Sequence, residues 1–393
     1  MKKLLLVMMA LLLFSAFSAC ERKAPDGKTT DGKSQNSFIV GVQAPITGEY
    51  ASEGQGMLNA VRLLAEQQNA EGKLNGAEIK VIECDDEGSP QKAAVCAKRL
   101  VNDGAKVVIG SYTSTATAAS QEIYANANVI QTSDATAAIL TKNNYKTYFR
   151  ASFNDDIEGE FTANYFVNVK RYERIAIISD YSAFSAGLAD AVTANIKKLG
   201  GNIVFDGKID ANAQDFRAVL TSVKAQNPDV IYFSGYYTQS GLLRTQMMEL
   251  DITADYVGGN ATDNPDFIKI AGEKNAVGAY LVGLPLPEQL DYPESLKFSS
   301  DYLEAFKAPV PSIWVVVNAD GLRVVFEAMK QVKSNDTVKA IEYIKGEMKD
   351  FPGLTGPITI QENGERVGSI YRVNIIGADL NYETVYYDPA SGK

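Results

Sequence analysis

The chain has 393 residues, more than one ordinary domain holds, so two domains are expected. It contains 38 Lys and Arg against 48 Asp and Glu, and the net charge of −10 argues against nucleic acid as a main partner. Histidine is absent from the sequence, which excludes Ser-His-Asp and Cys-His catalysis and removes the commonest zinc ligand. The three cysteines are too few for a disulfide-rich scaffold or a four-thiolate metal site, and no cofactor is expected.

The first residues have the pattern of an export signal. Lys2 and Lys3 precede an apolar run at 4–14 that is too short to span a bilayer comfortably, so 1–19 is predicted to be a signal peptide. The sequence Phe-Ser-Ala-Cys at 17–20 resembles a bacterial lipobox, with Phe17 where Leu is usual. Cleavage before Cys20 would attach lipid to that thiol and anchor the chain to a membrane. The alternative is a secreted protein with a chance cysteine.

Residues 20–37 are polar and lack an apolar period, so they are predicted to form a flexible linker. Within them, 27–34 matches the phosphate-binding pattern G-x-x-x-x-G-K-[ST]. That loop needs a buried strand before it and a helix after it, whereas here a charged coil precedes it and a strand follows. We therefore expect no nucleotide site there.

From residue 38 the sequence alternates between short apolar runs and segments with helical spacing. The first series predicts strands at 38–43, 79–83, 106–110 and 129–132, with helices at 54–69, 90–102 and 114–127. The second predicts strands at 174–180, 203–205, 229–234, 256–258 and 280–283, with helices between them. Such alternation predicts the α/β class, here as two doubly wound, Rossmann-like lobes with parallel sheets.

The pattern changes after Pro285. Helices are predicted at about 293–307, 312–333 and 337–349. Strands at 356–361 and 368–376 flank Asn363-Gly364, a dipeptide that is a strong hairpin signal, so these two strands are expected to pair.

Ligands of doubly wound sheets bind at the carboxyl ends of the strands, so the loops there are the candidate site. The loop 110–115 opens a helix, and hydroxyl groups with free N–H groups at a helix N-terminus suit an anion such as a carboxylate. The competing interpretation is simple capping of that helix by Thr113 or Ser114. Polar residues at 133–136 follow the next strand, and the two loops could share one small ligand.

Loops that follow strands of the second series are also candidates for ligand contact. Tyr236 follows a strand, where its ring can pack on an aliphatic group or merely cover the sheet edge. Asn260 follows two glycines that allow close backbone approach. A dinucleotide site is not expected, because Gly54 and Gly56 have no third glycine to complete G-x-G-x-x-G.

Cys84 ends a predicted strand and Cys96 lies on the next predicted helix. In an oxidising compartment the two could pair, although strand-to-helix distances are often too long for the bond. Two buried thiols are the alternative.

Several segments together resemble a known family. They are Gly41–Gly48 with Gly54, 85–86 with 90–93, 100–104 with 108–110, 132–136, 174–178, 235–237 and 270–272. Their order and spacing are similar to those of type I periplasmic solute-binding proteins of the branched-chain amino-acid-binding kind, in a lipoprotein form. The resemblance covers essentially all of 38–393.

The resemblance implies two lobes joined by three crossovers, an N-terminal lobe of 38–153 plus 286–369 and a C-terminal lobe of 154–285 plus 370–393. The lobes would close on a small amino acid by hinge motion, and the closed form would deliver it to the membrane permease of an ABC transporter. It implies an extracytoplasmic, lipid-anchored, monomeric binding protein and no enzyme. A ligand-sensing module for a receptor is the alternative within the binding class.

The resemblance also assigns site residues. Ser114 and Thr136 fall where the family binds the ligand carboxylate, with Thr113 and Ala135 beside them. Tyr236 and Phe184 fall at aromatic contacts. Asn260 stands where the family has an acidic residue that pairs with the ligand ammonium, and an amide is a weaker partner. Either Asp134 or Glu53 could supply the missing charge, or the ligand could be an ammonium-free carboxylate or amide.

Overall fold

A computed structural model describes residues 37–387. The predicted signal peptide, Cys20 and the phosphate-loop match at 27–34 lie outside the described residues. Of the predicted linker only Ser37 is described, and it is the first residue of strand β1 rather than linker. In this part of the chain, no helix combines the length and the apolar character needed to cross a membrane.

The first half of the described chain builds a five-stranded parallel sheet in the order β2-β1-β3-β4-β5. Its strands are β1 (Ser37–Ala44), β2 (Glu78–Asp85), β3 (Val107–Ile109), β4 (Ile130–Thr132) and β5 (Tyr148–Phe149). The helices along this stretch are α1 (Ala51–Glu71), α2 (Pro90–Asn102), α3 (Ser114–Asn126) and α4 (Ile139–Lys142).

Strands β3, β4 and β5 of this sheet are buried on both faces, which explains the continuous apolar run of β3. On β3, Val107 and Ile109 belong to the core under α1, whereas Val108 belongs to a separate core with residues of α2 and α3. A strand that alternates between two helix layers must be apolar at every position.

The second half builds a seven-stranded sheet in the order β14-β13-β10-β9-β8-β6-β7. Its strands are β6 (Ile175–Ser179), β7 (Ile203–Lys208), β8 (Val230–Phe233), β9 (Asp255–Gly258), β10 (Tyr280–Gly283), β13 (Arg372–Ile376) and β14 (Tyr382–Tyr387). Its helices are α5 (Asp155–Asn164), α6 (Ala183–Lys198), α7 (Arg217–Lys224), α8 (Tyr237–Glu249), α9 (Asp266–Ala271) and α10 (Glu273–Ala276), with π-helical η1 (Tyr165–Val169) and 3-10 helix η2 (Asn260–Thr262). The sheet is mixed rather than parallel, because β13 and β14 run antiparallel to their neighbours.

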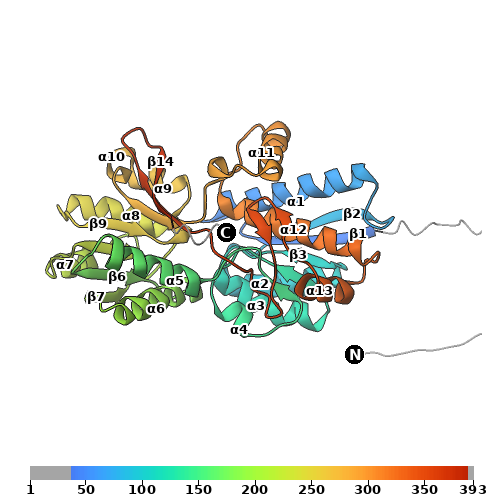
Figure 1. Cartoon of the computed structure of the whole chain (residues 1–393), viewed down its shortest axis with the longest axis horizontal. Coiled ribbons are helices and arrows are strands. Elements are labelled where there is room, and N and C mark those ends of the chain that lie inside the picture. Colours follow the sequence, from blue (N-terminus) through green and yellow to red (C-terminus); the bar gives the residue numbers. More distant parts are fainter. Residues whose placement is uncertain (1–36, 388–393) are drawn as a thin grey trace, which may run out of the picture. The chain divides into compact units, whose positions relative to one another are not determined.

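The segment between β10 and β13 returns to the first sheet. It contains η3 (Pro287–Gln289), α11 (Pro293–Phe306), α12 (Ile313–Gln331), α13 (Thr337–Gly346) and the strands β11 (Phe351–Gly353) and β12 (Gly356–Ile358). Helix α12 packs along α1, as Figure 1 shows, so residues far apart in sequence share one core.

The predicted hairpin around Asn363-Gly364 is wrong, because the strands on the two sides of the turn do not pair with each other. Strand β12 pairs with β11, and β13 pairs with β10 and β14. Only an isolated bridge between Ile360 and Arg366 flanks the turn. The turn signal was real, but the following apolar strand completes the larger sheet instead.

The predicted fold class is confirmed. The described chain forms two α/β lobes, each built on its own sheet, and it passes between them three times: after β5, after β10 and before β13. The exact lobe boundaries stay a prediction.

Candidate ligand-binding site

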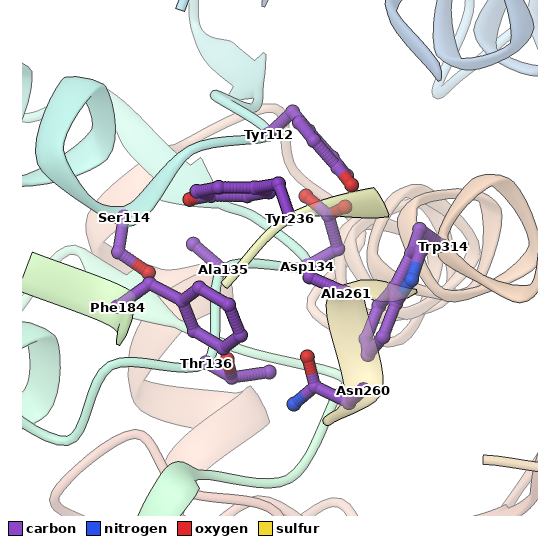
Figure 2. A pocket seen from close by; sticks show the side chains of 10 residues that line it. All are labelled: Tyr112, Ser114, Asp134, Ala135, Thr136, Phe184, Tyr236, Asn260, Ala261 and Trp314. Atoms are coloured by element: carbon purple, nitrogen blue, oxygen red, sulfur yellow. The ribbon is translucent and has the colours of Figure 1, made fainter. Parts of the chain in front are cut away.

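A small cavity lies where loops of the two lobes meet, with about 230 Å³ of space free of atoms. The first lobe contributes the loop before α3, the loop after β4 and the start of α12. The second contributes the start of α6, the residue before α8 and the residues after β9. Figure 2 shows the lining side chains: Tyr112, Ser114, Asp134, Ala135, Thr136, Phe184, Tyr236, Asn260, Ala261 and Trp314.

Most of the residues named from the sequence therefore come together in one place. Those that line the cavity are Ser114, Asp134, Ala135, Thr136, Phe184, Tyr236 and Asn260. Thr113 and Glu53 do not line it. Both are buried nearby and have other partners, described below.

The loop between β3 and α3 is built to turn sharply into the cavity. Gly110 has a φ of +118°, and a Cβ there would lie 1.8 Å from the backbone oxygen of Gln43, so only glycine fits. Thr113 then caps α3, its Oγ1 accepting from the N–H of Ala116 at 3.3 Å and donating to the oxygen of Gly88 at 3.1 Å. Thr113 is thus the helix cap, and Ser114 is the residue that reaches the cavity.

Ser114 is the first residue of α3 and sits in the positive end of the helix dipole. Its Oγ accepts the N–H of Ala137 at 3.3 Å, so the hydroxyl proton remains free to donate. A hydroxyl donor at a helix N-terminus is suited to an anion, and a carboxylate needs no basic residue there.

The neighbouring loop, 133–137, is fixed by the buried Arg150. Its guanidinium donates to the backbone oxygens of Ala135 at 2.8 Å and Ala137 at 3.0 Å, and it pairs with Glu365 at 3.3 Å. These bonds hold Asp134, Ala135 and Thr136 against the cavity. They also occupy the arginine, and among the described residues no lysine or arginine lines the cavity.

Aromatic rings form one wall. The ring centroid of Tyr236 lies 5.1 Å from that of Phe184 and 5.7 Å from that of Tyr112. Phe184 and Tyr236 come from the second lobe and Tyr112 from the first, so the stack closes only when the lobes are together. Burial raises the pKa of Tyr236 well above its ordinary value, and its phenol therefore stays neutral.

Asn260 is backed by an acid that the sequence analysis did not name. Its backbone N–H donates to Glu158 Oε1 at 3.0 Å, and its side-chain nitrogen donates to Glu158 Oε2. Because the amide nitrogen donates to Glu158, the amide oxygen points toward the cavity, as Figure 2 shows. Burial raises the pKa of Glu158 well above its usual range, and the charge of Asp155 adds to the effect.

Asp134, Tyr112 and Trp314 differ from the other lining residues. Asp134 Oδ1, the Tyr112 hydroxyl and Trp314 Nε1 are buried and have no hydrogen-bond partner among the described residues. Burial raises the pKa of Asp134 well above its usual range, an effect that the amide of Asn318 opposes and the charge of Glu53 reinforces.

Glu53 links three parts of the structure instead of facing the cavity. Its Oε1 accepts from the amide of Asn264, and its Oε2 accepts from the hydroxyl of Ser312, both at 2.6 Å. Ser312 in turn caps α12, and Asn264 belongs to the second lobe. The carboxyl therefore joins the start of α1 to α12 and to the opposite lobe.

Other contacts also bring the lobes together around the cavity. Glu49 accepts from Thr238 at 2.5 Å and from Gln239 at 2.7 Å, and Thr115 accepts the N–H of Ala183 at 3.2 Å. The structure thus represents a closed arrangement of the two lobes.

Sequence reasoning missed Tyr112, Ala261, Trp314 and Glu158. The first two adjoin named residues in the same loops, so attention to whole loops would have found them. Trp314 and Glu158 lie on α12 and α5, away from any strand end, and no local pattern marks them.

Cys84 and Cys96 are joined by a disulfide, with their Cα atoms 5.5 Å apart. Of the two alternatives that the sequence left open, the structure has the bonded one. The bond ties β2 to α2 on the face of the first sheet opposite α1.

A two-lobed α/β structure with an interlobe cavity defines a class of ligand-binding proteins. A family model described as periplasmic binding protein matches residues 38–378, and the chain belongs to this family. The resemblance recognised in the sequence is therefore confirmed. The family consists of extracytoplasmic binding proteins rather than enzymes.

Similar proteins carry names of the same class of binding protein. The chain is 30% identical to an amino acid binding protein of Pseudomonas aeruginosa, over 78% of this chain and 82% of that one. It is 28% identical to the Leu/Ile/Val-binding protein of Escherichia coli K12, over 84% and 88%. A crystal structure of the leucine binding protein LivK from Thermotoga maritima is similar with a TM-score of 0.82 and 25% identity, covering 90% of this chain and 99% of that one.

Proposed function

We propose that this protein is the substrate-binding component of an ABC transporter and binds a small α-amino acid in the cavity between its lobes. The observation that carries the proposal is the convergence of Ser114, Thr136 and Asn260 on one small cavity at the N-terminus of α3. The amino-acid-binding names of its relatives support the same ligand class.

The polar groups at one end of the cavity match the head of an amino acid. The hydroxyl of Ser114 and the dipole of α3 suit the carboxylate. The amide oxygen of Asn260 suits the ammonium, and the two hydrogen bonds to Glu158 behind it fix the orientation of the amide. This pair takes the place of the single acidic residue expected from the family.

Delivery would follow from hinge motion between lobes of 38–153 plus 286–369 and 154–285 plus 370–393. Ligand contacts from both lobes favour the closed form, which the permease would recognise. A lipid on Cys20 would keep a monomeric protein at the membrane. Replacing Cys20 by Ser is expected to release the protein from the membrane fraction without changing its affinity for ligand.

The single tryptophan of the sequence, Trp314, lines the cavity and provides a direct assay. Purified protein, unfolded and refolded to remove bound ligand, is titrated with each of the twenty amino acids and with small carboxylates and amides lacking an ammonium. A saturable change in tryptophan fluorescence with an amino acid supports the proposal. A response only to ammonium-free compounds, or to none, contradicts it.

Variants of the head-group end test the site itself. Ser114→Ala and Thr136→Val each remove one hydroxyl donor, and a hydrogen bond to a charged group contributes about 1.5–3 kcal/mol. The dissociation constant should therefore rise by about 10- to 100-fold for each. Ser222→Ala, on the exposed face of α7, is the matched control and should leave it unchanged.

A further inference from the structure

The end of the cavity away from Ser114 and Thr136 carries polar groups that have no hydrogen-bond partner within residues 37–387. Asp134 Oδ1, Trp314 Nε1 and the Tyr112 hydroxyl are all buried there and unpaired among the described residues. Figure 2 shows the carboxyl of Asp134 and the hydroxyl of Tyr112 together, with the indole of Trp314 on the same side of the cavity. Buried polar groups in native proteins are nearly always hydrogen-bonded, so unpaired groups in a ligand cavity indicate what the ligand supplies.

We propose that the ligand is an α-amino acid whose side chain ends in a carboxamide, received by Asp134 and Trp314. The proposal rests on the function proposed above and specifies the substrate class of the same cavity. The carboxamide N–H₂ would donate to Asp134, and its oxygen would accept from Trp314 Nε1.

Other side chains match these groups less well. An aliphatic side chain would exclude water from Asp134 Oδ1 and Trp314 Nε1 without offering either atom a hydrogen bond. A terminal ammonium can satisfy Asp134 but offers no acceptor to the indole, which can only donate. A terminal carboxylate places a second negative charge beside Asp134, whose nearby charged group Glu53 is also acidic.

The match does not depend on the protonation state of Asp134. Burial raises the pKa of this carboxyl, and a protonated carboxyl carries one donor and one acceptor. A carboxamide carries both as well, so it can pair with either form.

Asparagine and leucine provide the decisive comparison, because they have the same branched shape and differ in polarity. Ligand-free full-length protein is titrated by calorimetry with asparagine, glutamine, leucine, threonine, lysine and glutamate. Asparagine or glutamine should bind at least ten times more tightly than leucine, and more tightly than the other three. Leucine, threonine, lysine or glutamate binding as tightly as the best amide would overturn the proposal, whereas binding of no amino acid would defeat the proposed function itself.

Two variants test the assigned residues. Asp134→Leu should raise the dissociation constant for the preferred amide at least tenfold while leaving that for leucine unchanged or lower, and retained leucine binding shows that the cavity is intact. Trp314→Phe keeps the ring and removes the N–H, and should weaken amide binding several-fold. Asp190→Leu, on the exposed face of α6, is the matched control. Equal loss of amide and leucine binding in Asp134→Leu would show a structural role and refute the assignment.

Discussion

The start of α1 and the loop after β4 each bury an acidic side chain, but they use it differently. At the start of α1, both oxygens of Glu53 accept hydrogen bonds, from Asn264 and Ser312. In the loop after β4, Asp134 Oδ1 has no partner among the described residues. The comparison teaches that burial alone does not identify a ligand group. The carboxyl of Glu53, with both oxygens bonded, holds the lobes together, whereas Asp134 Oδ1 is free among the described residues to accept from a ligand.

The largest effect that this comparison predicts is on stability at Glu53. Glu53→Ala leaves the Asn264 amide and the Ser312 hydroxyl without their acceptor and opens a cavity, so the free energy of unfolding should fall by about 3–4 kcal/mol. Urea denaturation of ligand-free protein measures it. An equal loss in Asp134→Ala would erase the distinction between the two carboxyls.

The pH dependence of stability gives a second test. Burial raises the pKa of Glu53 from 4.5 to about 7, against the hydrogen bonds from Ser312 and Asn264. Between pH 4.5 and 7 the folded protein keeps a proton that the unfolded chain has released, so stability falls as the pH rises through this window. The fall from this group is about 3 kcal/mol, and it is absent below pH 4.5. Glu53→Gln should flatten the profile by that amount, and an unchanged profile would contradict the assignment.

Removing only one of the partners should cost less. Asn264→Ala deletes the donor from the second lobe but leaves the bond from Ser312 in place. The expected loss is about 1–2 kcal/mol in the free energy of unfolding, again from urea denaturation. A loss as large as that of Glu53→Ala would mean that the carboxyl acts through Asn264 alone.

The smallest predicted change is at Asp134. Asp134→Asn keeps the shape of the side chain, and Oδ1 of the carboxyl has no hydrogen-bond partner to lose among the described residues, so the free energy of unfolding should change by less than about 0.5 kcal/mol. The substitution should instead change the affinity for ligand. A loss above about 2 kcal/mol without ligand would assign Asp134 a structural role like that of Glu53.

The sequence predicted those features that depend on local pattern. Alternating strands and helices located both sheets, and the rule that ligands bind at strand ends located the loops of Ser114, Thr136 and Tyr236. The pattern could not predict that Glu158 would stand behind Asn260, or that Trp314 would reach the cavity from α12, because these contacts depend on the packing of helices distant in sequence. The same limit explains the hairpin around Asn363-Gly364. A turn signal fixes where the chain bends but not which strand the next segment joins.

The bond between Cys84 and Cys96 has a consequence for how the protein matures. Disulfides persist in oxidising compartments and are rare in the reducing cytosol, so a chain that has just been synthesised carries two thiols at this place. The oxidised form is two hydrogens lighter, and its thiols no longer react with alkylating reagents. Mass spectrometry of the protein from whole cells, with free thiols blocked at lysis, can therefore distinguish molecules that have been exported from those still awaiting export.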